Sequence, residues 1–353
     1  MINKEIENIL KVYNFDAHAL RGRHFFKGIL DYRAKILPRH KWRIKRDRDF
    51  QCVLCFGRRG KLFLEWQSGY RLFSCPVCGA VSANITADTK HIDDVYNNKV
   101  YYRKFEQEIL KHYAYRKKTQ GVERYDYTIK RLGINPKKAR VLDLGCGAGY
   151  FVSVLKERGI PLARGLEVNP AQVRYCRRRG LNVAGADLAD EPDGFYDLIT
   201  MFDVLEHLPD PIAVMKIAAK KLSPGGFVVA YTPNIHSLAY YLMGSAQNTL
   251  LPFEHFCFYN KKSFAYLARK SGFLPPDVEI RGFDVMDYLL MKEYKDGVNY
   301  TDKLGKFMNV LQACVDKLEL GNHFRVTFRK AGRLPRAEAG QLGRGRQSVL
   351  TRS

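Results

Sequence analysis

The segment LDLGCGAGYF, residues 142–151, joins a hydrophobic run to three closely spaced glycines, a pattern typical of a strand that turns into a ligand-binding helix. A dinucleotide site would show G-x-G-x-x-G, whose third glycine lets the helix pack closely on the strand. Here Gly145, Gly147 and Gly149 give G-x-G-x-G, and Tyr150 stands where the third dinucleotide glycine should be. The spacing therefore argues against a dinucleotide.

Acidic residues stand at the ends of successive hydrophobic runs that we interpret as strands. Asp143 ends the first run, and its carboxylate would repel a diphosphate but would attract a cationic group such as an ammonium. Glu167 ends the second run, where a carboxylate can bind two ribose hydroxyls. Asp187 follows the third run, in position to meet an adenine amino group. Any one of these carboxylates could instead cap a turn or helix, but together they predict a cationic ligand without phosphate.

From residue 139 onward, short hydrophobic strands alternate with helical segments, as in a doubly wound sheet. The pattern predicts an α/β fold with a mostly parallel, Rossmann-like sheet of seven strands. We expect an edge position for the last strand, because HFRVTFRK alternates strictly. The segment Met286 to Gly321 is predicted to be helical and to cover the substrate mouth. The expected strands are RVLDLG, ARGLEV, LNVAGA, YDLITMF, GFVVAYT, DVEIRG and HFRVTFRK.

Together with P-G-G at 224–226, this order of motifs resembles the class I S-adenosylmethionine-dependent methyltransferases over roughly residues 120–330. The resemblance implies S-adenosylmethionine as the cofactor, which is cationic and carries no phosphate. In that family the glycine turn passes close to the methionine part, and the residue that matches Glu167 binds the ribose. The implied cofactor-binding residues are Asp143, Gly145, Gly147, Gly149, Glu167, Asp187, Leu188, Met201 and Phe202.

Three later segments are similar to a subgroup of small-molecule methyltransferases: FDVLEHLPDP, TPNIHSLAYYLMG and EHFCFYNKKSFAYLARKSGF. Members of this wider group carry a Cys-rich N-terminal module, and some are C-methyltransferases of deoxysugar pathways with a similar Glu-His pair. The longer C-terminal domain of those sugar enzymes has no counterpart in this sequence. The resemblance therefore supports a small-molecule acceptor more strongly than it supports a sugar or C-methylation.

Methyl transfer requires an aligned acceptor and, for many acceptors, a group that removes a proton. We predict His255 as the general base, because it lies in a loop before a helix on the acceptor side and imidazole titrates near neutrality. Glu254 is its predicted orienting partner. His207, in LEHLPDP, is the alternative base. For either histidine, a purely structural role stays open.

Four cysteines form two C-x2-C pairs, Cys52 with Cys55 and Cys75 with Cys78, separated by nineteen residues. Two such pairs are typical of a structural zinc site, and four thiolates leave no coordination position open for catalysis. With short strands expected in KLFLEW and YRLFSC, residues 50–85 are predicted to form a zinc ribbon. The alternative is four buried cysteines without metal.

The formal net charge of the 353 residues is +23, and the two ends hold much of it. Residues 1–50 and residues 325–353 each have a balance of +7. No hydrophobic run reaches the roughly 20 residues that span a bilayer, and the N-terminus lacks a signal peptide's apolar core, so we expect a cytoplasmic protein. The predicted organisation is a basic arm (1–49), the ribbon (50–85), a helical connector (86–135), the methyltransferase domain (136–330) and a disordered basic tail (331–353).

Three functions from different classes are compatible with these features. The first is an enzyme that methylates a sugar or another small metabolite. The second is an RNA methyltransferase that binds nucleic acid through the ribbon and the basic ends. Against it, strand four lacks the Asn/Asp-Pro-Pro-Tyr/Phe motif of many nucleic-acid methyltransferases. The third is a noncatalytic binding protein, which the intact Asp143, glycines and Glu167 argue against. The acceptor, the methylated atom and the oligomeric state are not predicted.

Overall fold

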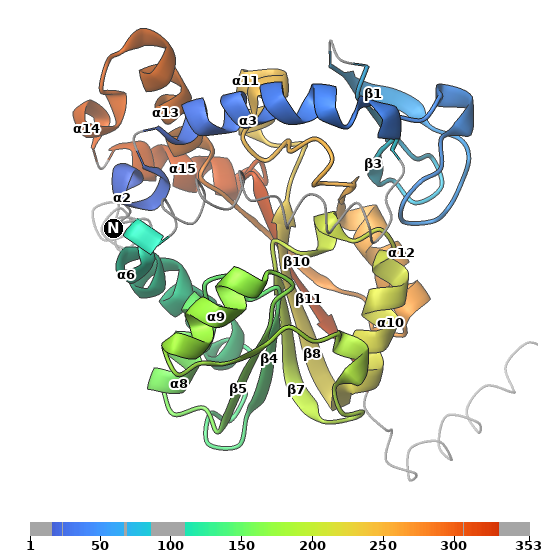
Figure 1. The fold of residues 1–353 in the computed structure, drawn as a ribbon, viewed down its shortest axis with the longest axis vertical. Coiled ribbons are helices and arrows are strands. Elements are labelled where there is room, and N and C mark those ends of the chain that lie inside the picture. Colours follow the sequence, from blue (N-terminus) through green and yellow to red (C-terminus); the bar gives the residue numbers. More distant parts are fainter. Residues whose placement is uncertain (1–15, 23, 67–68, 86–109, 306, 332–353) are drawn as a thin grey trace, which may run out of the picture.

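The computed structural model describes residues 16–22, 24–66, 69–85, 110–305 and 307–331. Its centre is a seven-stranded sheet with the order β10-β11-β8-β7-β4-β5-β6 (Figure 1). The neighbours from β8 to β6 pair in parallel, whereas β11 and β10 are antiparallel. The predicted fold class is therefore confirmed. The strands are β4 (Arg140–Leu144), β5 (Leu162–Leu166), β6 (Asn182–Ala184), β7 (Tyr196–Phe202), β8 (Leu222–Pro233), β10 (Asp277–Arg281) and β11 (His323–Arg329).

Helices cover both faces of this sheet, with α8 and α9 on one side and α10 and α12 on the other (Figure 1). Three of the four begin at a side-chain cap: Asn169, Asp210 and Asn260 each accept a hydrogen bond from a backbone N–H of the first turn. These caps explain why the chain turns into a helix soon after β5 and β7. The bounds are α8 (Tyr150–Glu157), α9 (Pro170–Arg178), α10 (Pro211–Lys221) and α12 (Lys261–Ser271).

A further helical stretch precedes β4 and packs against α8. It combines α-helical and π-helical turns without a break from Tyr113 to Lys130. Its members are α6 (Tyr113–Arg116), η3 (Lys117–Gly121), α7 (Val122–Tyr125) and η4 (Asp126–Lys130). This stretch is the described part of the predicted connector, whose residues 86–109 lie outside the described residues. The predicted tail also lies outside them from residue 332.

The last strand, β11, lies inside the sheet between β8 and β10, so the predicted edge position was wrong. It pairs with β8 over its full length, and β10 covers its other side. The alternation that suggested an edge has another cause. Arg325 projects from one face of the strand, and the rings of Tyr127 and Tyr231 lie beneath its guanidinium. Because such ring contacts accommodate a charged side chain, a strand inside the sheet can carry polar residues at alternate positions.

The ribbon region forms a second, antiparallel sheet with the order β1-β2-β3-β9. Three of its strands come from the predicted ribbon, but the fourth comes from the catalytic region about 170 residues later. Buried residues of both sheets belong to one hydrophobic core. The ribbon is thus joined to the rest of the protein by main-chain pairing. The strands are β1 (Lys61–Glu65), β2 (Arg71–Ser74), β3 (Val81–Ala83) and β9 (Cys257–Phe258).

Helices from both ends of the chain pack together above the sheet (Figure 1). The buried Arg33 of the N-terminal arm donates to the carbonyls of Ser245 and Gln247, and Arg21 pairs with the fully buried Asp287. The described part of the arm is therefore packed on the domain, and the segment predicted as a helical insertion contains most of α13 and all of α14 and α15. These elements are α2 (Ala17–Arg21), α3 (Phe25–Arg39), η1 (Lys41–Arg43), η2 (Asp47–Asp49), α11 (Leu238–Met243), η7 (Gly244–Ala246), α13 (Asp284–Asp296), α14 (Tyr300–Leu304) and α15 (Phe307–Lys317).

Among the described residues, no helix is both long enough and apolar enough to cross a membrane.

Candidate active site

The glycine turn between β4 and α8 adopts a backbone that favours glycine at three positions. Gly145, Gly147 and Gly149 have φ values of 68°, 55° and 76°. A Cβ at Gly145 would lie 2.6 Å from Cγ2 of Val204, and one at Gly149 would lie 2.7 Å from Cδ1 of Leu181. The backbone conformation therefore favours glycine at all three positions, and close packing adds to this at Gly145 and Gly149. The turn ends at the start of α8, a position that offers backbone N–H groups to a ligand.

Glu167 joins the turn to the next helix. It is buried, and its carboxylate accepts hydrogen bonds from the N–H groups of Gly147, at 2.8 Å, and Asn169, at 2.9 Å. A carboxylate has about four acceptor positions, so these bonds leave capacity for ribose hydroxyls. Sequence reasoning predicted the ribose contact but missed this second role as a brace for the turn.

Asp143 lies beside the same turn and is buried. The pairing of β4 with β7 sets it opposite Thr200, whose hydroxyl donates to its carboxylate at 2.6 Å. Burial raises the pKa of Asp143 to about 7, while the Thr200 hydroxyl and the charge of Arg124 act in the opposite direction. The carboxylate is thus poised to ionise fully when a cation binds nearby.

The other predicted cofactor residues differ in their surroundings. Asp187 is exposed and caps a short 3-10 helix, η5 (Leu188–Asp190), through Ala189 N–H, while Leu188 is buried. Met201 is fully buried in the core. Phe202 faces the opposite side of β7 and packs against other rings. The side chains of Met201 and Phe202 thus mainly support the end of the sheet.

Two histidines from distant segments meet just beyond β7. His207 ends the short 3-10 helix η6 (Leu205–His207), His255 lies in the loop before β9, and their ring centroids are 4.5 Å apart. Nδ1 of His207 lies 3.0 Å from the Glu254 carbonyl, and Nδ1 of His255 lies 2.6 Å from the Thr249 carbonyl. Because a carbonyl only accepts, each neutral ring carries its proton on Nδ1 and its lone pair on Nε2.

Glu206 completes this cluster, which we call the acceptor triad: Glu206, His207 and His255. One ligand atom of each lies within 4.8 Å of the others. Oε2 of the fully buried Glu206 accepts from Thr232, whereas Oε1 has no hydrogen-bond partner among the described residues and lies 3.9 Å from His207 Nε2. Sequence reasoning singled out His207 but missed Glu206, although the adjacent Glu-His pair after strand four was a usable signal.

The carboxylate of Glu254 was predicted to orient His255. Nδ1 of His255 hydrogen-bonds to the Thr249 carbonyl, and Glu254 contributes its backbone carbonyl to His207 instead.

The triad also has unusual electrostatics. Burial lowers the pKa of His207 to about 4 and that of His255 well below its ordinary value. Burial, helped by the charge of Asp203, raises the pKa of Glu206 well above its ordinary value. Two neutral imidazoles and one carboxyl group suit a divalent cation.

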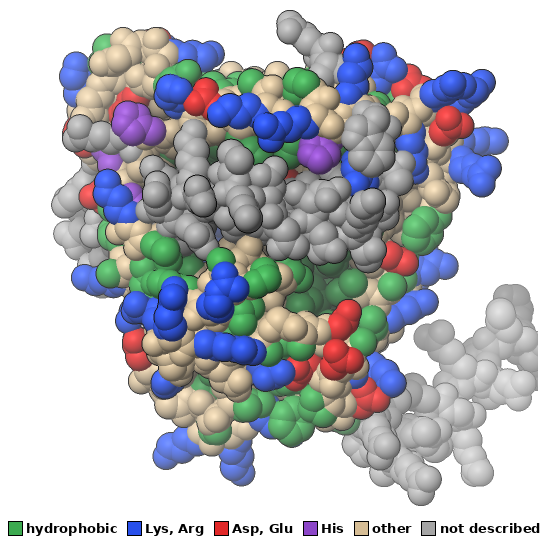
Figure 2. All heavy atoms as spheres, in the orientation of Figure 1, with side chains coloured by type: hydrophobic (Ala, Val, Ile, Leu, Met, Phe, Trp, Pro, Cys, Tyr) green, Lys and Arg blue, Asp and Glu red, His purple; other side chains and the backbone are tan. Residues whose placement is uncertain are grey.

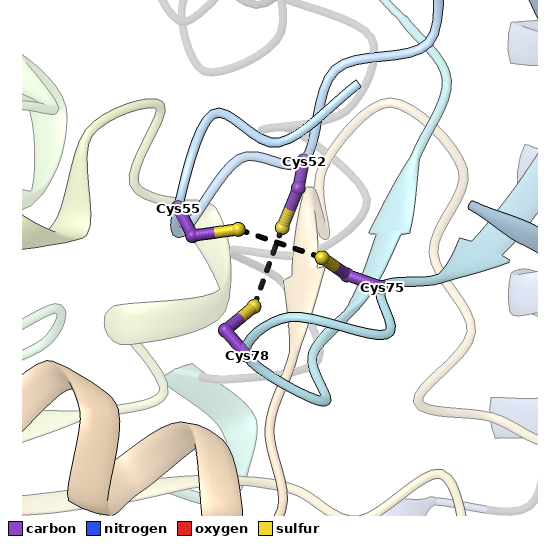
Figure 3. Close-up of side chains that lie close together, drawn as sticks. All are labelled: Cys52, Cys55, Cys75 and Cys78. Carbon is purple, nitrogen blue, oxygen red and sulfur yellow. Dashed lines mark hydrogen bonds between the residues drawn. The ribbon is translucent and has the colours of Figure 1, made fainter. Parts of the chain in front are cut away.

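The four ribbon cysteines converge with their sulfur atoms pointing toward one another (Figure 3). Sγ of Cys52 lies 3.5 Å from that of Cys78, and Sγ of Cys55 lies 3.4 Å from that of Cys75. These separations exceed the roughly 2.05 Å of a disulfide and approach the edge of a tetrahedron with Zn–S bonds of about 2.3 Å. The donor set therefore fits a structural zinc ion, and zinc itself stays a prediction.

Residues 112–274 match the family model described as a methyltransferase domain. The ubiquinone biosynthesis O-methyltransferase of Bordetella avium is 28% identical over 189 residues, which cover 49% of this chain and 77% of that protein. The protein of the same name from Xanthomonas oryzae pv. oryzae is 34% identical over 120 residues. That match covers 31% of this chain and 49% of the relative, so the chain spans about half the relative's length.

Solved structures of methyltransferases are similar to this chain at lower identity. An S-adenosylmethionine-dependent methyltransferase of Thermotoga maritima, described as a possible histamine N-methyltransferase, is 18% identical with a TM-score of 0.44. The similarity covers 68% of this chain and 98% of that one. A methyltransferase of Archaeoglobus fulgidus is 20% identical with a TM-score of 0.41, covering 59% of this chain and 94% of that one.

Purified protein should contain about one zinc ion per chain, held by Cys52, Cys55, Cys75 and Cys78. Cys75→Ser should lose the metal and lower thermal stability, because structural zinc contributes directly to the free energy of folding. Elemental analysis of protein prepared without chelators measures the zinc. Cys314→Ser is the matched control, since Cys314 is exposed and lies outside the cluster. A zinc content near zero in the wild-type protein would exclude the site.

Glu167→Ala should weaken binding of S-adenosylmethionine by about 1.5 to 3 kcal/mol, the usual range for hydrogen bonds to a charged group. Isothermal titration calorimetry measures the affinity, and thermal melting shows whether the variant still folds. Glu157→Ala is the control, because Glu157 lies on α8 with an exposed side chain. Equal affinity of a folded Glu167→Ala protein and the wild type would mean that Glu167 does not contact the cofactor.

The affinity for S-adenosylmethionine should rise with pH through about 7 because of Asp143. Below its pKa the carboxyl group is protonated, and a cationic ligand must displace that proton, which costs up to about tenfold in affinity per pH unit. Above the pKa the carboxylate is already formed and the dependence ends. Calorimetry between about pH 6 and pH 7.5 tests this. Asp143→Asn should bind more weakly and with a flat profile; an equally steep profile in the variant would assign the titration to another group.

Proposed function

Because residues 112–274 form a class I, S-adenosylmethionine-dependent methyltransferase domain, we propose that this protein methylates an oxygen atom of a small-molecule acceptor. The named relatives are O-methyltransferases of ubiquinone biosynthesis, which supports an oxygen of a small metabolite as the acceptor atom. The observation that carries the proposal is the acceptor triad, which adjoins the glycine turn through Val204.

When bound, S-adenosylmethionine supplies a methyl group already activated by its sulfonium. The protein must then align the acceptor atom with the methyl group and provide for removal of the acceptor's proton. Glu167 and the glycine turn would hold the cofactor, and the ionised Asp143 would face its cationic end. Val204 contacts the turn and Glu206 follows two residues later, so the triad would meet the acceptor next to the cofactor.

We infer that the triad works through a divalent cation rather than through a histidine base alone. A general base is most effective when its pKa lies near the working pH, and a pKa of about 4 makes His207 a weak one. Three donor atoms converge, and Oε1 of Glu206 has no hydrogen-bond partner among the described residues, which favours a cation between them. A cation would lower the pKa of an acceptor hydroxyl, whose proton would then pass to solvent, because the Nε2 lone pair of His255 would bind the cation.

The alternative acceptor, RNA, would need a basic surface on the protein. In Figure 2, Lys and Arg side chains gather over α9, where Arg174, Arg177, Arg178 and Arg179 are exposed. Two of these four have partners within the protein. Arg177 donates to the Val183 carbonyl, and the guanidinium of Arg179 lies 4.3 Å from the ring centroid of Tyr113. Salt-dependent binding of RNA in the micromolar range would favour the alternative.

His255→Ala should lower turnover by about 100- to 10,000-fold, the usual contribution of a positioned acid or base, while cofactor affinity stays close to wild type. If a cation is involved, Glu206→Gln and His207→Ala should lower turnover as well, and all three variants should lose binding of Mn²⁺. Radiolabelled methyl transfer to a panel of phenols and other hydroxyl acceptors measures turnover. Electron paramagnetic resonance measures Mn²⁺ binding.

His18→Ala is the matched control, because His18 lies in α2, outside the triad. If His255→Ala alone loses turnover and the wild type does not bind Mn²⁺, His255 acts as a base without a cation. If His207→Ala abolishes turnover and His255→Ala stays within a few fold of wild type, the base is His207. Wild-type turnover in all three triad variants would disprove the acceptor role of the triad.

A further inference from the structure

The ribbon sheet is completed by the chain segment that carries His255. β3 pairs with β9 so that Val81 lies opposite Phe258 and Ser82 opposite Cys257. His255 precedes β9 by only two residues. Without β9, the outer side of β3 would present unpaired backbone groups. The ribbon and the acceptor side of the catalytic domain therefore share one hydrogen-bonded sheet.

Phe256 links the ribbon to the acceptor triad through both of its backbone polar groups. Its carbonyl accepts from the N–H of Ala83 in β3 at 2.9 Å, and its own N–H donates to the Glu206 carbonyl at 2.7 Å. The residues on either side of these bonds are buried. A displacement of β3 would thus be transmitted to His255, the neighbour of Phe256, and to Glu206.

Tyr70 provides a second link, on the other side of His255. Its hydroxyl accepts from the N–H of Phe253 at 3.4 Å and donates to the carbonyl of His255 at 3.5 Å. Phe253 has a φ of 67°, a conformation that is unfavourable for a bulky residue and persists only when its surroundings hold it. The ring of Tyr70 packs edge-on against that of Phe253, with centroids 5.1 Å apart. The ribbon thus stabilises the strained backbone that precedes His255.

The cysteine cluster contacts these links directly. Sγ of Cys52 lies 3.5 Å from the hydroxyl of Ser82, the residue opposite Cys257 in the sheet. Gly79 directly follows Cys78 of the second cysteine pair. Its carbonyl accepts a hydrogen bond from the side chain of Asn260, which also caps α12. The geometry of the four thiolates therefore determines where β3 and the start of α12 lie.

We propose that the metal-bound ribbon positions His255, so that occupancy of the cysteine site controls methyl transfer without controlling cofactor affinity. Tyr70 is the positioning residue that conveys this control, together with the pairing of β3 and β9. The proposal rests on the proposed role of the acceptor triad. The cofactor residues lie on or shortly after β4, β5, β6 and β7, and none of these strands pairs with a described ribbon strand.

Tyr70→Phe in the full chain tests the link without touching a metal ligand. It removes one hydroxyl, so zinc content and affinity for S-adenosylmethionine should stay within about twofold of wild type, while turnover falls about three- to tenfold. The ring-nitrogen NMR signals of His255 should shift, and the amide of Phe256 should exchange about three- to tenfold faster. Tyr300→Phe is the matched control, because the Tyr300 hydroxyl bonds an exposed residue of the helical insertion.

Removal of zinc by a chelator is the second test of this proposal. Exchange of the Phe256 amide should accelerate more than that of Leu142 in β4, and S-adenosylmethionine should still bind. If zinc removal unfolds the whole chain, the measurements on Tyr70→Phe alone test the proposal. Unchanged His255 signals, Phe256 exchange and turnover in Tyr70→Phe would overturn the proposal. A wild-type protein without methyl transfer would refute the proposed function instead, because the NMR and exchange readouts do not depend on activity.

Discussion

The parallel pairing of β4 with β5 and β7 is the constraint on which the site depends. It aligns Asp143 with Gly165 on one side and with Thr200 on the other, so that three loops leave the sheet at one edge. The glycine turn can then lie against Val204, and Glu167 can brace the turn through Gly147. A shift of one residue in either pairing would separate these groups and would move every side chain to the opposite face.

Burial gives the site its electrostatic character. Although the chain carries a net charge of +23, Asp143 and Glu206 at the sheet edge are buried, and burial raises the pKa of both carboxyl groups. The neutral state of His207 has the same cause. Such a site holds little charge of its own and gains most from ligands that bring positive charge, namely a sulfonium cofactor and a metal cation. This property supports both proposals about the chemistry, beside the convergence of the three donor atoms.

The ribbon is integrated into the catalytic domain rather than attached to it. A separate zinc module would bury its own small core and meet the domain through side chains. Here the backbone of β9 completes the ribbon sheet, and the core residues of both parts form one cluster. Phe256 stands at the junction, bonded to Ala83 on one side and to Glu206 on the other. The cysteine cluster and the segment that carries His255 therefore share one backbone hydrogen-bond network and one hydrophobic core.

The sequence by itself determined the features that depend on local spacing. The G-x-G-x-G turn after a strand, the acidic strand ends and the two C-x2-C pairs predicted the sheet, the cofactor and the cysteine cluster, because each rests on residues close together in the chain. Only the tertiary structure decided what depends on distant partners. It brought His207 to His255 and added Glu206, moved β11 inside the sheet, and joined β9 to the ribbon. Strand order and loop contacts are set by packing over the whole chain, and no local pattern encodes them.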